Sequence, residues 1–321
     1  MAITSKVLIT GGAGFIGSNL ADELIRQGAR VSIIDNFITG FRENLEEITG
    51  DFEFIEGDIN DEQIVAKAVE GVEVVFHEAA LPSVPRSVAN PAETHRICVD
   101  GTFNVLVHAQ KAGVKRFIYA ASSSAYGDQP TLPKVETMRP DPLSPYAAAK
   151  LAGELYCRAF NNVYGIETFS LRYFNVFGPR QNPESMYSGV ISRFIDALMT
   201  GQNPVIFGDG EQSRDFTYVA NVVNANIMAA QASTGMGETM NVANGDRVSL
   251  NRLLEILRTI TDINHLEAVY EPARAGDVKH SQADNHRAVE CLGYSELVGL
   301  EEGLKKTIDW WKTSRFSKQN T

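Results

Sequence analysis

A tyrosine and a lysine occur four positions apart in the sequence Tyr146-Ala-Ala-Ala-Lys150. On a helix, this spacing places the phenol and the ammonium group one turn apart on the same face. A free tyrosine has a pKa of about 10, and a nearby cation lowers that pKa because it favours the phenolate. A phenol whose pKa lies nearer neutrality can take a proton from a substrate hydroxyl group. The pair is therefore a candidate acid–base site.

Three consecutive serines, Ser122, Ser123 and Ser124, follow the apolar run 117–121. A hydroxyl group at the carboxyl end of a parallel strand faces the crevice in which ligands bind. Any one of the three could hold a substrate oxygen while Tyr146 moves the proton, and the sequence leaves open which of them does. A serine run by itself is also typical of a polar loop.

A glycine-rich turn follows the first apolar run, at 7–10, with the spacing Gly-x-x-Gly-x-x-Gly. A phosphate-binding turn needs residues without a Cβ atom where the chain bends sharply and where the backbone approaches a pyrophosphate. The helix that follows the turn directs free backbone N–H groups toward the phosphates. The spacing alone also fits a plain strand-to-helix turn. The cofactor contacts expected from this turn are Gly11, Gly14, Phe15, Ile16 and Gly17.

Two aspartates favour a dinucleotide as the ligand. Asp35 ends the second predicted strand, 18 residues after Gly17, where a carboxylate can accept hydrogen bonds from both ribose hydroxyl groups. It would also repel a 2′-phosphate, which favours NAD over NADP. Asp58 follows the third strand and could bond the adenine amino group, although a loop aspartate without any role is an equal alternative. Their neighbours Asn36 and Ile59 are expected at the same site.

These groups can act together only if the elements that carry them bring their ends to one place. Strands are predicted at 7–10, 31–34, 52–55, 72–77, 117–121 and 168–171, and helices at 14–27, 92–112 and 145–163. Alternation at this spacing predicts parallel strands joined by right-handed crossovers. Continuously apolar strands predict a sheet covered on both faces. The predicted fold is therefore α/β, a Rossmann-type doubly wound parallel sheet.

After about residue 176 the pattern changes to loops rich in Pro, Gly, Asn and Asp, with short strands such as 204–207 and helices such as 249–261 and 300–312. No flexible linker marks the border. We predict an NAD-binding Rossmann domain at 1–176, which also takes in a returning helix at about 219–232. The rest, 177–321, is predicted to be a smaller C-terminal α/β region that binds the substrate.

The composition narrows the range of partners. The 321 residues carry a formal net charge of -11, and an acidic surface repels phosphate polymers, so we expect no nucleic-acid partner. Cys98, Cys157 and Cys291 match no metal-binding spacing and are typical of reduced thiols in a cytoplasmic protein. The histidines show no ligand spacing either, so we expect no metal. The first residues resemble neither a signal peptide nor a membrane span, and we expect a cytoplasmic protein without a membrane partner.

Together these motifs resemble the extended short-chain dehydrogenase/reductase family. The resemblance covers essentially the whole chain, and within the family it is strongest to the bacterial UDP-N-acetylglucosamine/UDP-glucose 4-epimerases. The strings that carry it are 80–87 (ALPSVPRS), 120–127 (AASSSAYG) and 171–181 (LRYFNVFGPRQ). They are long and specific.

The resemblance implies roles for residues that spacing alone does not single out. Ala79, Ala80 and Tyr173 would contact the cofactor, with Tyr173 near the nicotinamide, and Lys150 would bond the nicotinamide ribose. The implied substrate contacts are Ser83, Asn175, Val190, Val205, Phe207, Arg214, Arg274 and Asp277. The apolar members would line a uracil slot, and the arginines would clamp the diphosphate because their forked donors suit its oxygens. Arginines paired at the surface are the alternative.

The family includes several reactions that begin with oxidation at C4 of a nucleotide sugar. Similar dehydratases have an Asp-Glu pair after the first hydroxyl residue and similar decarboxylases a glutamate, whereas this chain has Ser123 and Ser124. Tyrosine, lysine and serine can remove a hydride and return it. We hypothesise that Lys150 and the positive nicotinamide ring together lower the pKa of Tyr146. Tyr146 then takes the 4-hydroxyl proton, and the C4 hydride passes to NAD. The 4-keto sugar then turns about its phosphate link and receives the hydride on its other face.

The sugar and the assembly are further expectations. Ser281 stands where similar epimerases control the room around the sugar, and its small side chain favours N-acetylhexosamines beside glucose and galactose; a loop serine without this role is the alternative. The resemblance also implies a homodimer in which helices 92–112 and 145–163 form a four-helix bundle with a second copy. A UDP-hexuronic acid 4-epimerase, another nucleotide-sugar oxidoreductase or decarboxylase, and a non-catalytic NAD-sensing protein are the alternative functions.

Overall fold

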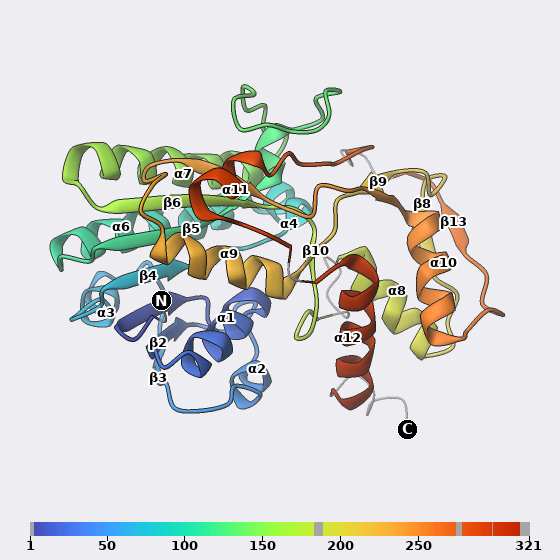
Figure 1. The fold of residues 1–321 in the computed structure, drawn as a ribbon, viewed down its shortest axis with the longest axis horizontal. Coiled ribbons are helices and arrows are strands. Elements are labelled where there is room, and N and C mark those ends of the chain that lie inside the picture. Colours follow the sequence, from blue (N-terminus) through green and yellow to red (C-terminus); the bar gives the residue numbers. More distant parts are fainter. Residues whose placement is uncertain (1–2, 183–188, 274–277, 297, 315–321) are drawn as a thin grey trace.

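The centre of the molecule is a seven-stranded sheet with the strand order β11-β6-β5-β4-β1-β2-β3 (Figure 1). The computed structural model describes residues 3–182, 189–273, 278–296 and 298–314. The strands are β1 (Lys6–Thr10), β2 (Arg30–Asp35), β3 (Glu53–Glu56), β4 (Val74–His77), β5 (Arg116–Ser122), β6 (Glu167–Tyr173) and β11 (Thr239–Val242). Every neighbouring pair is parallel. The predicted doubly wound fold is confirmed, and its strand order reverses between β1 and β4, where such sheets bind ligands.

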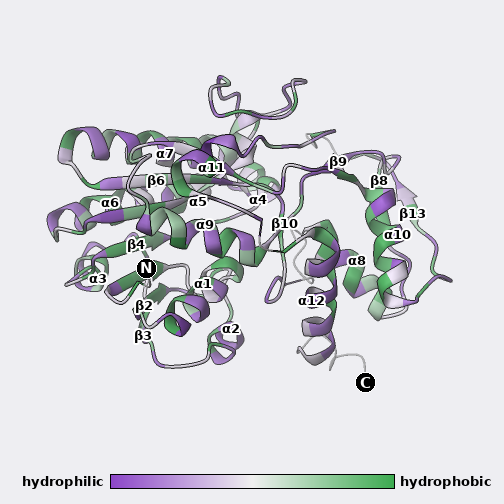
Figure 2. Ribbon diagram, viewed as in Figure 1, coloured by the Kyte–Doolittle hydropathy of each residue, from purple (hydrophilic) through white to green (hydrophobic). Residues whose placement is uncertain are grey.

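Helices cover both faces of this sheet. One face carries α1 (Phe15–Arg26) and α9 (Val219–Gln231), and the other carries α3 (Glu62–Ala68), α6 (Thr102–Lys111) and α7 (Pro145–Tyr164). Successive strand residues point to opposite faces, so Val7 and Ile9 belong to the core under α1 and α9, whereas Leu8 belongs to the core under the other layer. Figure 2 shows hydrophobic and hydrophilic residues alternating along these helices, as expected when one side packs on a sheet.

The segment predicted as one helix at 92–112 consists of three successive parts. It begins with α5 (Pro91–His95), widens into the π-helix η1 (Arg96–Gly101) and continues as α6. Asn90 caps the start by accepting a hydrogen bond from the backbone amide of Glu93. Gly101 lies so close to Ile59 that a Cβ atom at that position would be 2.6 Å from the isoleucine side chain. The wide turn therefore sits where the helix passes the loop after β3.

The chain returns to the sheet twice after residue 176. The predicted helix at 219–232 is α9, which packs on β5, β6 and β11. Strand β11 itself was not predicted, and it extends the sheet beyond β6. Its four residues follow Gly235 and Gly237, which both have positive φ, and this turn makes so short a strand look like part of a loop.

The remaining elements form a smaller region beside the sheet, at the right of Figure 1. Its helices are α8 (Val190–Met199), α10 (Leu250–Thr261) and α12 (Leu300–Thr313), and its strand pairs are β8 (Val205–Phe207) with β13 (Val269–Glu271), β9 (Ser213–Arg214) with β12 (Val248–Ser249), and β7 (Val176–Phe177) with β10 (Thr217–Tyr218). Shorter helices complete the fold: α2 (Arg42–Glu46), α4 (Val84–Ala89), η2 (Ser123–Tyr126) and α11 (His286–Leu292).

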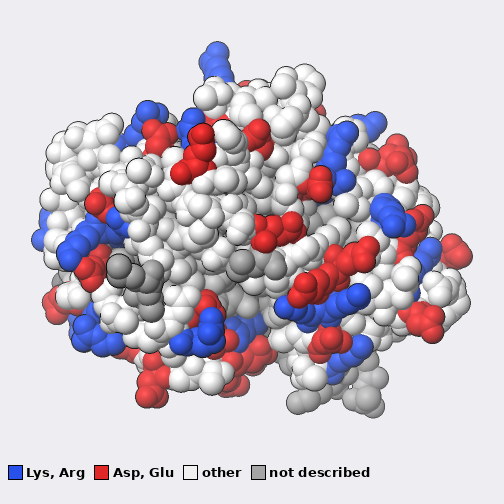
Figure 3. All heavy atoms as spheres, in the orientation of Figure 1, with Lys and Arg blue, Asp and Glu red and all other residues white. Residues whose placement is uncertain are grey.

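The surface mixes charges of both signs. Acidic and basic side chains lie side by side over most of the face drawn in Figure 3. Among the helices in the described ranges, none combines the length and the apolar composition that crossing a membrane requires.

Candidate active site

A large cavity of about 740 Å³ lies over the carboxyl ends of β1, β2, β4 and β5. Pockets that hold small molecules and cofactors have volumes of about 300–1,000 Å³. The residues that line it and that the sequence predicted are Gly11, Gly14, Phe15, Ile16, Gly17, Asp35, Asn36, Asp58, Ile59, Ala79, Ala80, Ser83, Ser122, Ser123, Ser124, Tyr146, Lys150, Tyr173 and Asn175. The fold therefore brings the glycine turn, the aspartates and the Tyr-Lys pair to one cavity.

The glycine turn has room for no side chain at two positions. Gly11 has φ +72, and a Cβ atom there would lie 2.7 Å from the backbone of Ala79. A Cβ atom on Gly17 would lie 2.3 Å from the carbonyl oxygen of Gly11. Gly14 is the N-cap of α1 and makes no side-chain cap, so the first amides of the helix stay available for an anion. This turn fits the pyrophosphate of a dinucleotide.

Asp35 lies at the end of β2 with its carboxylate held by two backbone amides. Oδ2 accepts from the amide of Ala13 at 3.0 Å, and Oδ1 accepts from the amide of Phe37 at 2.8 Å. Burial raises the pKa of Asp35, and these amides oppose the shift. Each carboxylate oxygen can accept a further hydrogen bond, which suits the vicinal hydroxyl groups of a ribose.

Asp58 has partners within the chain. Its Oδ1 accepts from the backbone and the side chain of Asn60 at 2.9 and 2.8 Å, and its Oδ2 accepts from Arg96 at 3.1 Å. Burial acts to raise the pKa of Asp58, but these hydrogen bonds and the arginine charge together lower it. The carboxylate lines the cavity in its ionised form, and its contact with adenine stays a prediction.

The Tyr-Lys pair is positioned by the start of α7. Ser144 caps this helix by accepting a hydrogen bond from the amide of Ala147 at 3.1 Å, and Pro145 occupies its first turn. Tyr146 lines the cavity, where its hydroxyl group is hydrogen-bonded to Ser122 at the end of β5. Of the three serines, Ser122 is thus the direct partner of the phenol.

The other two serines also line the cavity. Ser124 donates a hydrogen bond from its hydroxyl group to that of Ser122 at 2.8 Å. Its backbone amide also contacts the same hydroxyl oxygen, at 3.2 Å. Ser123 lines the cavity beside them. The 3₁₀ turn η2, which starts at Ser123, is what gathers these hydroxyl groups.

Burial dominates the electrostatics of the pair. Lys150 is buried, with its ammonium 4.4 Å from the centre of the Tyr119 ring, and burial lowers its pKa. Burial also raises the pKa of Tyr146 above its usual value, and Cys98 and Glu78 add to the shift while the bond to Ser122 opposes it. In the protein alone, desolvation of the phenol thus outweighs one neighbouring cation. The lowered pKa predicted from Lys150 together with the positive nicotinamide ring stays a prediction.

A buried ion pair joins α7, the helix that carries Tyr146 and Lys150, to strand β6. Glu154 on α7 accepts two hydrogen bonds from Arg172 on β6, at 2.9 and 2.7 Å, and both side chains are 4% exposed. The guanidinium lies 4.5 Å from the centre of the Tyr126 ring, whose hydroxyl group donates to Asn241 on β11 at 2.7 Å. The sequence analysis missed this network. Its signal was a glutamate four residues after Lys150 and an arginine directly after the predicted strand 168–171.

Glu78 is a further cavity residue that the sequence analysis did not select. It directly follows β4 and accepts a hydrogen bond from the hydroxyl group of Tyr173 at 2.7 Å. Asn226 on α9 donates to that same hydroxyl group at 2.7 Å. Burial raises the pKa of Glu78 to about 7, and Lys150 opposes the shift. Its signal in the sequence was a carboxylate at the end of a predicted strand, as with Asp35.

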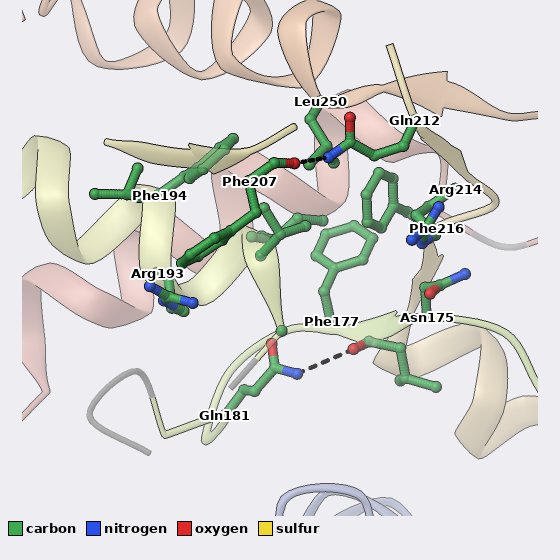
Figure 4. A pocket seen from close by; sticks show the side chains of 15 residues that line it. Asn175, Phe177, Gln181, Arg193, Phe194, Phe207, Gln212, Arg214, Phe216 and Leu250 are labelled. Atoms are coloured by element: carbon green, nitrogen blue, oxygen red, sulfur yellow. Dashed lines mark hydrogen bonds between the residues drawn. The ribbon is translucent and has the colours of Figure 1, made fainter. Parts of the chain in front are cut away.

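A second cavity of about 230 Å³ lies in the smaller region, and its lining begins with the segment that follows β6. Val190, Val205 and Phe207 line it, as the resemblance implied, together with Arg214 and Asn175. Figure 4 shows the rings of Phe177 and Phe216 beside each other, with the ring of Phe207 on the side of Arg193 and with Arg214 and Asn175 on the opposite side. Flat aromatic walls with polar groups at one end suit a base attached to phosphates.

The two cavities share a boundary. Asn175, Val176, Gln181 and Gly189 line both of them. Asn175 has φ +36, and its amide donates to the carbonyl oxygen of Asp215 at 2.9 Å. A ligand whose base lies among the aromatic rings could therefore extend past Asn175 toward Tyr146.

Arg214, which lines the second cavity, is held by backbone carbonyl groups. Its guanidinium donates to the carbonyl oxygens of Ser213 and Lys279 at 3.0 and 3.1 Å. Ser281 is half-buried next to it, with its amide donating to Ser213 at 3.0 Å. Ser281 is not among the described residues that line either cavity, so its contact with a sugar stays a prediction. The predicted contacts Arg274 and Asp277 lie outside the described residues.

Comparison with known proteins agrees with this geometry. A family model described as the NAD dependent epimerase/dehydratase family matches residues 7–243. The chain belongs to the NAD-dependent epimerase/dehydratase family. The glycine turn, Asp35 and the cavity between them are what an NAD-dependent family requires, so the predictions of the family and of NAD as the cofactor are confirmed.

Three relatives illustrate the place of the chain in this family. A UDP-glucose 4-epimerase of Mycolicibacterium smegmatis is 38% identical over 96% of this chain and 98% of its own. The solved UDP-N-acetylglucosamine 4-epimerase from Methanobrevibacter ruminantium, in complex with UDP-N-acetylmuramic acid, has a TM-score of 0.92 and 39% identity over 97% and 99% of the two chains. The UDP-glucose 4-epimerase of Thermotoga maritima with UDP-glucose has a TM-score of 0.91 and 40% identity over 96% and 99%.

Proposed function

We propose that this chain is an NAD-dependent UDP-hexose 4-epimerase. The observation that carries the proposal is the position of Tyr146. Its hydroxyl group, bonded to Ser122, lies in the cofactor cavity, and this cavity shares Asn175 and three further lining residues with the aromatic cavity. A sugar whose nucleotide lies among Phe177, Phe207 and Phe216 would reach the phenol and the cofactor at the same place.

The side chains of this site would hold and move one proton. Bound NAD supplies the hydride acceptor and donor for C4 of the sugar. Ser122 orients the phenol of Tyr146, which takes the proton of the 4-hydroxyl group and later returns it. Lys150 supplies a buried positive charge one turn away. Because burial holds the pKa of Tyr146 high in the protein alone, a second positive charge, that of the oxidised nicotinamide ring, would be needed to favour the phenolate.

Serines at the end of β5 favour epimerisation over elimination. Ser123 and Ser124 stand where similar dehydratases have an acid and a base, and a hydroxyl group of ordinary pKa replaces neither. Ser124 is also engaged with Ser122 at 2.8 Å. The groups beside Tyr146 on this strand end are thus suited to holding an oxygen and not to removing water from C5 and C6.

The test is direct. Purified protein is incubated with UDP-N-acetylglucosamine, UDP-glucose or UDP-glucuronic acid, and the anomeric protons are followed by NMR. We expect galacto-configured product to appear without net formation of NADH, which would be seen as absorbance at about 340 nm. Net NADH or a decarboxylated sugar would support the oxidoreductase or decarboxylase instead. Three unchanged substrates in the presence of added NAD would overturn the epimerase proposal on these sugars.

The sugar range is the finer part of the proposal. We propose that UDP-N-acetylhexosamines are accepted beside UDP-glucose and UDP-galactose, because Ser281 leaves room where a larger side chain would not. The related enzymes support both classes, since one is a UDP-N-acetylglucosamine 4-epimerase and the other carries UDP-glucose. The relative rates in the NMR assay measure this range.

The active form is proposed to be a homodimer through α7 and the α5–η1–α6 segment. Large apolar side chains gather on these elements and on the adjacent α4 while staying exposed: Val88, Phe103, Leu155, Tyr156, Val163 and Tyr164. The rings of Phe103 and Tyr156 contact each other across the two helices, with centres 5.0 Å apart. A second copy that covers this surface would remove it from water. We expect twice the monomer mass by light scattering, and a monomer for Leu155→Lys; a wild-type monomer at working concentrations contradicts the dimer.

A further inference from the structure

A carboxyl group at the catalytic end of the cofactor cavity has no place in the proton transfer described above. Glu78 lines the same cavity as Tyr146, Lys150 and Tyr173. It stands at the carboxyl end of β4, next to β5, whose last residue is Ser122. The glycine turn and Asp35 hold the other part of this cavity, so Glu78 belongs to the end at which chemistry would occur.

The carboxyl group is held in a defined position. Tyr173 donates its hydroxyl proton to Oε1 of Glu78 at 2.7 Å, and the tyrosine oxygen in turn accepts from Asn226 at 2.7 Å. Asn226 lies on α9 and is fully buried. A chain of hydrogen bonds that crosses from α9 to the sheet therefore fixes Glu78 at the cavity wall.

The described groups that face Glu78 include a single cation. From α7 they are Lys150 and Tyr146, and from β6 Tyr173. The thiol of Cys98 on η1 acts on the same lysine and tyrosine. Lys150 is the one cation among these described groups.

The neighbouring histidine does not add a second cation. The two ring nitrogens of His77 are within 2.8 and 2.9 Å of the hydroxyl groups of Thr10 and Thr102. Burial lowers the pKa of His77 to about 3, so the ring is neutral at physiological pH. Burial also raises the pKa of Glu78 to about 7. The carboxyl group can therefore gain or lose its proton in the physiological range.

We propose that Glu78 balances the charge of the nicotinamide. Its carboxylate stabilises the oxidised, positively charged ring, and Glu78 is protonated and neutral when the reduced, uncharged ring is bound. This inference rests on the proposed function, which puts the nicotinamide at the Tyr146 end of the cavity. Two opposite charges within several ångströms in a partly buried site change a binding equilibrium by about tenfold or more. An enzyme that must hold NAD in its oxidised form between turnovers benefits from such a group.

The matched variant is Glu78→Gln. Glutamine keeps the shape of the side chain and an oxygen that accepts from Tyr173, and it removes only the charge. The control variant is Glu73→Gln, because Glu73 directly precedes the same strand at its amino end and forms an exposed pair with Lys115. All proteins carry Tyr146→Phe, so that titration of the phenol does not contribute to the measurement.

The experiment uses the full-length holoenzyme. It is exchanged against mixtures of NAD⁺ and NADH from about pH 6 to pH 8.5, until the bound ratio no longer changes, and the bound dinucleotides are quantified after rapid desalting. The pH range brackets the pKa of Glu78, which is raised to about 7. As pH rises, Glu78 ionises and NAD⁺ is favoured, so the ratio of the dissociation constants of NADH and NAD⁺ should rise about tenfold. In Glu78→Gln the change should be threefold or less, and Glu73→Gln should follow the parent.

The outcomes separate this inference from the proposed function. A change above threefold that persists in Glu78→Gln overturns the role of Glu78 and leaves epimerisation standing. A ratio that stays within threefold in the Tyr146→Phe parent also overturns it, whether or not Glu78→Gln folds. If the wild-type protein binds neither dinucleotide, the proposed function itself fails. If both dinucleotides bind and the ratio of their dissociation constants changes with pH as expected, the role of Glu78 is supported. If the wild-type protein then epimerises no sugar, only the proposed reaction is contradicted.

Discussion

The two cavities of this molecule are built from different kinds of structure. The cofactor cavity lies on the ends of long parallel strands, whose positions are fixed by the hydrogen-bonded register of the sheet. The second cavity is lined by two-residue and three-residue strands, the start of α8 and the segment around Asn175. The cofactor cavity thus holds the reacting groups on regular secondary structure. Residues of the second cavity could be substituted without displacing those groups.

The same contrast appears in the charges. In the sheet half, Glu154 and Arg172 form an ion pair with both side chains 4% exposed. In the smaller region, Arg252 and Glu255 on α10 form a pair in which each side chain is 62% exposed. In the buried pair, each charged side chain needs the opposite charge of the other to offset its loss of water. In the exposed pair, water solvates both side chains whether or not they contact each other. Each of the following substitutions tests whether the sheet half carries out catalysis and the smaller region binds the substrate.

The largest effect is expected at the phenol. Tyr146→Phe removes the proton acceptor and leaves the cavity walls in place, so kcat for epimerisation should fall by about a thousandfold. The amount of NAD bound should be unchanged. Tyr270→Phe is the control, because Tyr270 lies on β13, lines neither cavity and is 56% exposed. Full turnover by Tyr146→Phe would show that Tyr146 is not the proton acceptor and would contradict the assignment of catalysis to the sheet half.

The next effect is on folding. Glu154→Gln leaves the guanidinium of Arg172 without its buried counter-charge, and we expect the free energy of unfolding to fall by about 3–5 kcal/mol. Glu255→Gln, in the exposed pair, should cost about 0–1 kcal/mol. Urea denaturation followed by circular dichroism measures both. Equal losses from the two variants would mean that the halves do not differ in how they depend on charge.

A smaller effect is expected in the second cavity. Arg214→Ala removes a charged donor from the wall of the second cavity, and a charge-assisted hydrogen bond contributes about 1.5–3 kcal/mol. The KM for the UDP-sugar should therefore rise by about tenfold to a hundredfold, with little change in kcat and none in bound NAD. Arg252→Ala on α10 should change none of these steady-state values. A fall in kcat with KM unaltered would place Arg214 in the chemistry instead.

The smallest effect concerns the sugar. In Ser281→Tyr the added ring should fill the space proposed for the N-acetyl group, and the preference for UDP-N-acetylglucosamine relative to UDP-glucose should fall by about tenfold. Competition between the two substrates in one NMR sample gives this ratio directly. Ser281→Ala should leave it unchanged. A ratio insensitive to tyrosine would show that another part of the wall selects the sugar.

The amino-acid sequence alone determined the frame of the site. The spacing of Gly11, Gly14 and Gly17 and the pair Tyr146 and Lys150 reflect local rules, one for a turn and one for a helix face. Apolar strand runs determined the parallel sheet, and a parallel sheet gathers its strand ends at one edge. These features depend on neighbours in the chain, so they can be inferred without coordinates.

The tertiary structure decided the electrostatics and the partners. It showed that burial raises the pKa of Tyr146 although Lys150 is one turn away, that Ser122 is the serine bonded to the phenol, and that β11 extends the sheet. It also brought Glu78 to Tyr173, 95 residues away in sequence. Desolvation and hydrogen bonds between distant segments depend on what surrounds a group in space, and spacing along the chain does not contain that information.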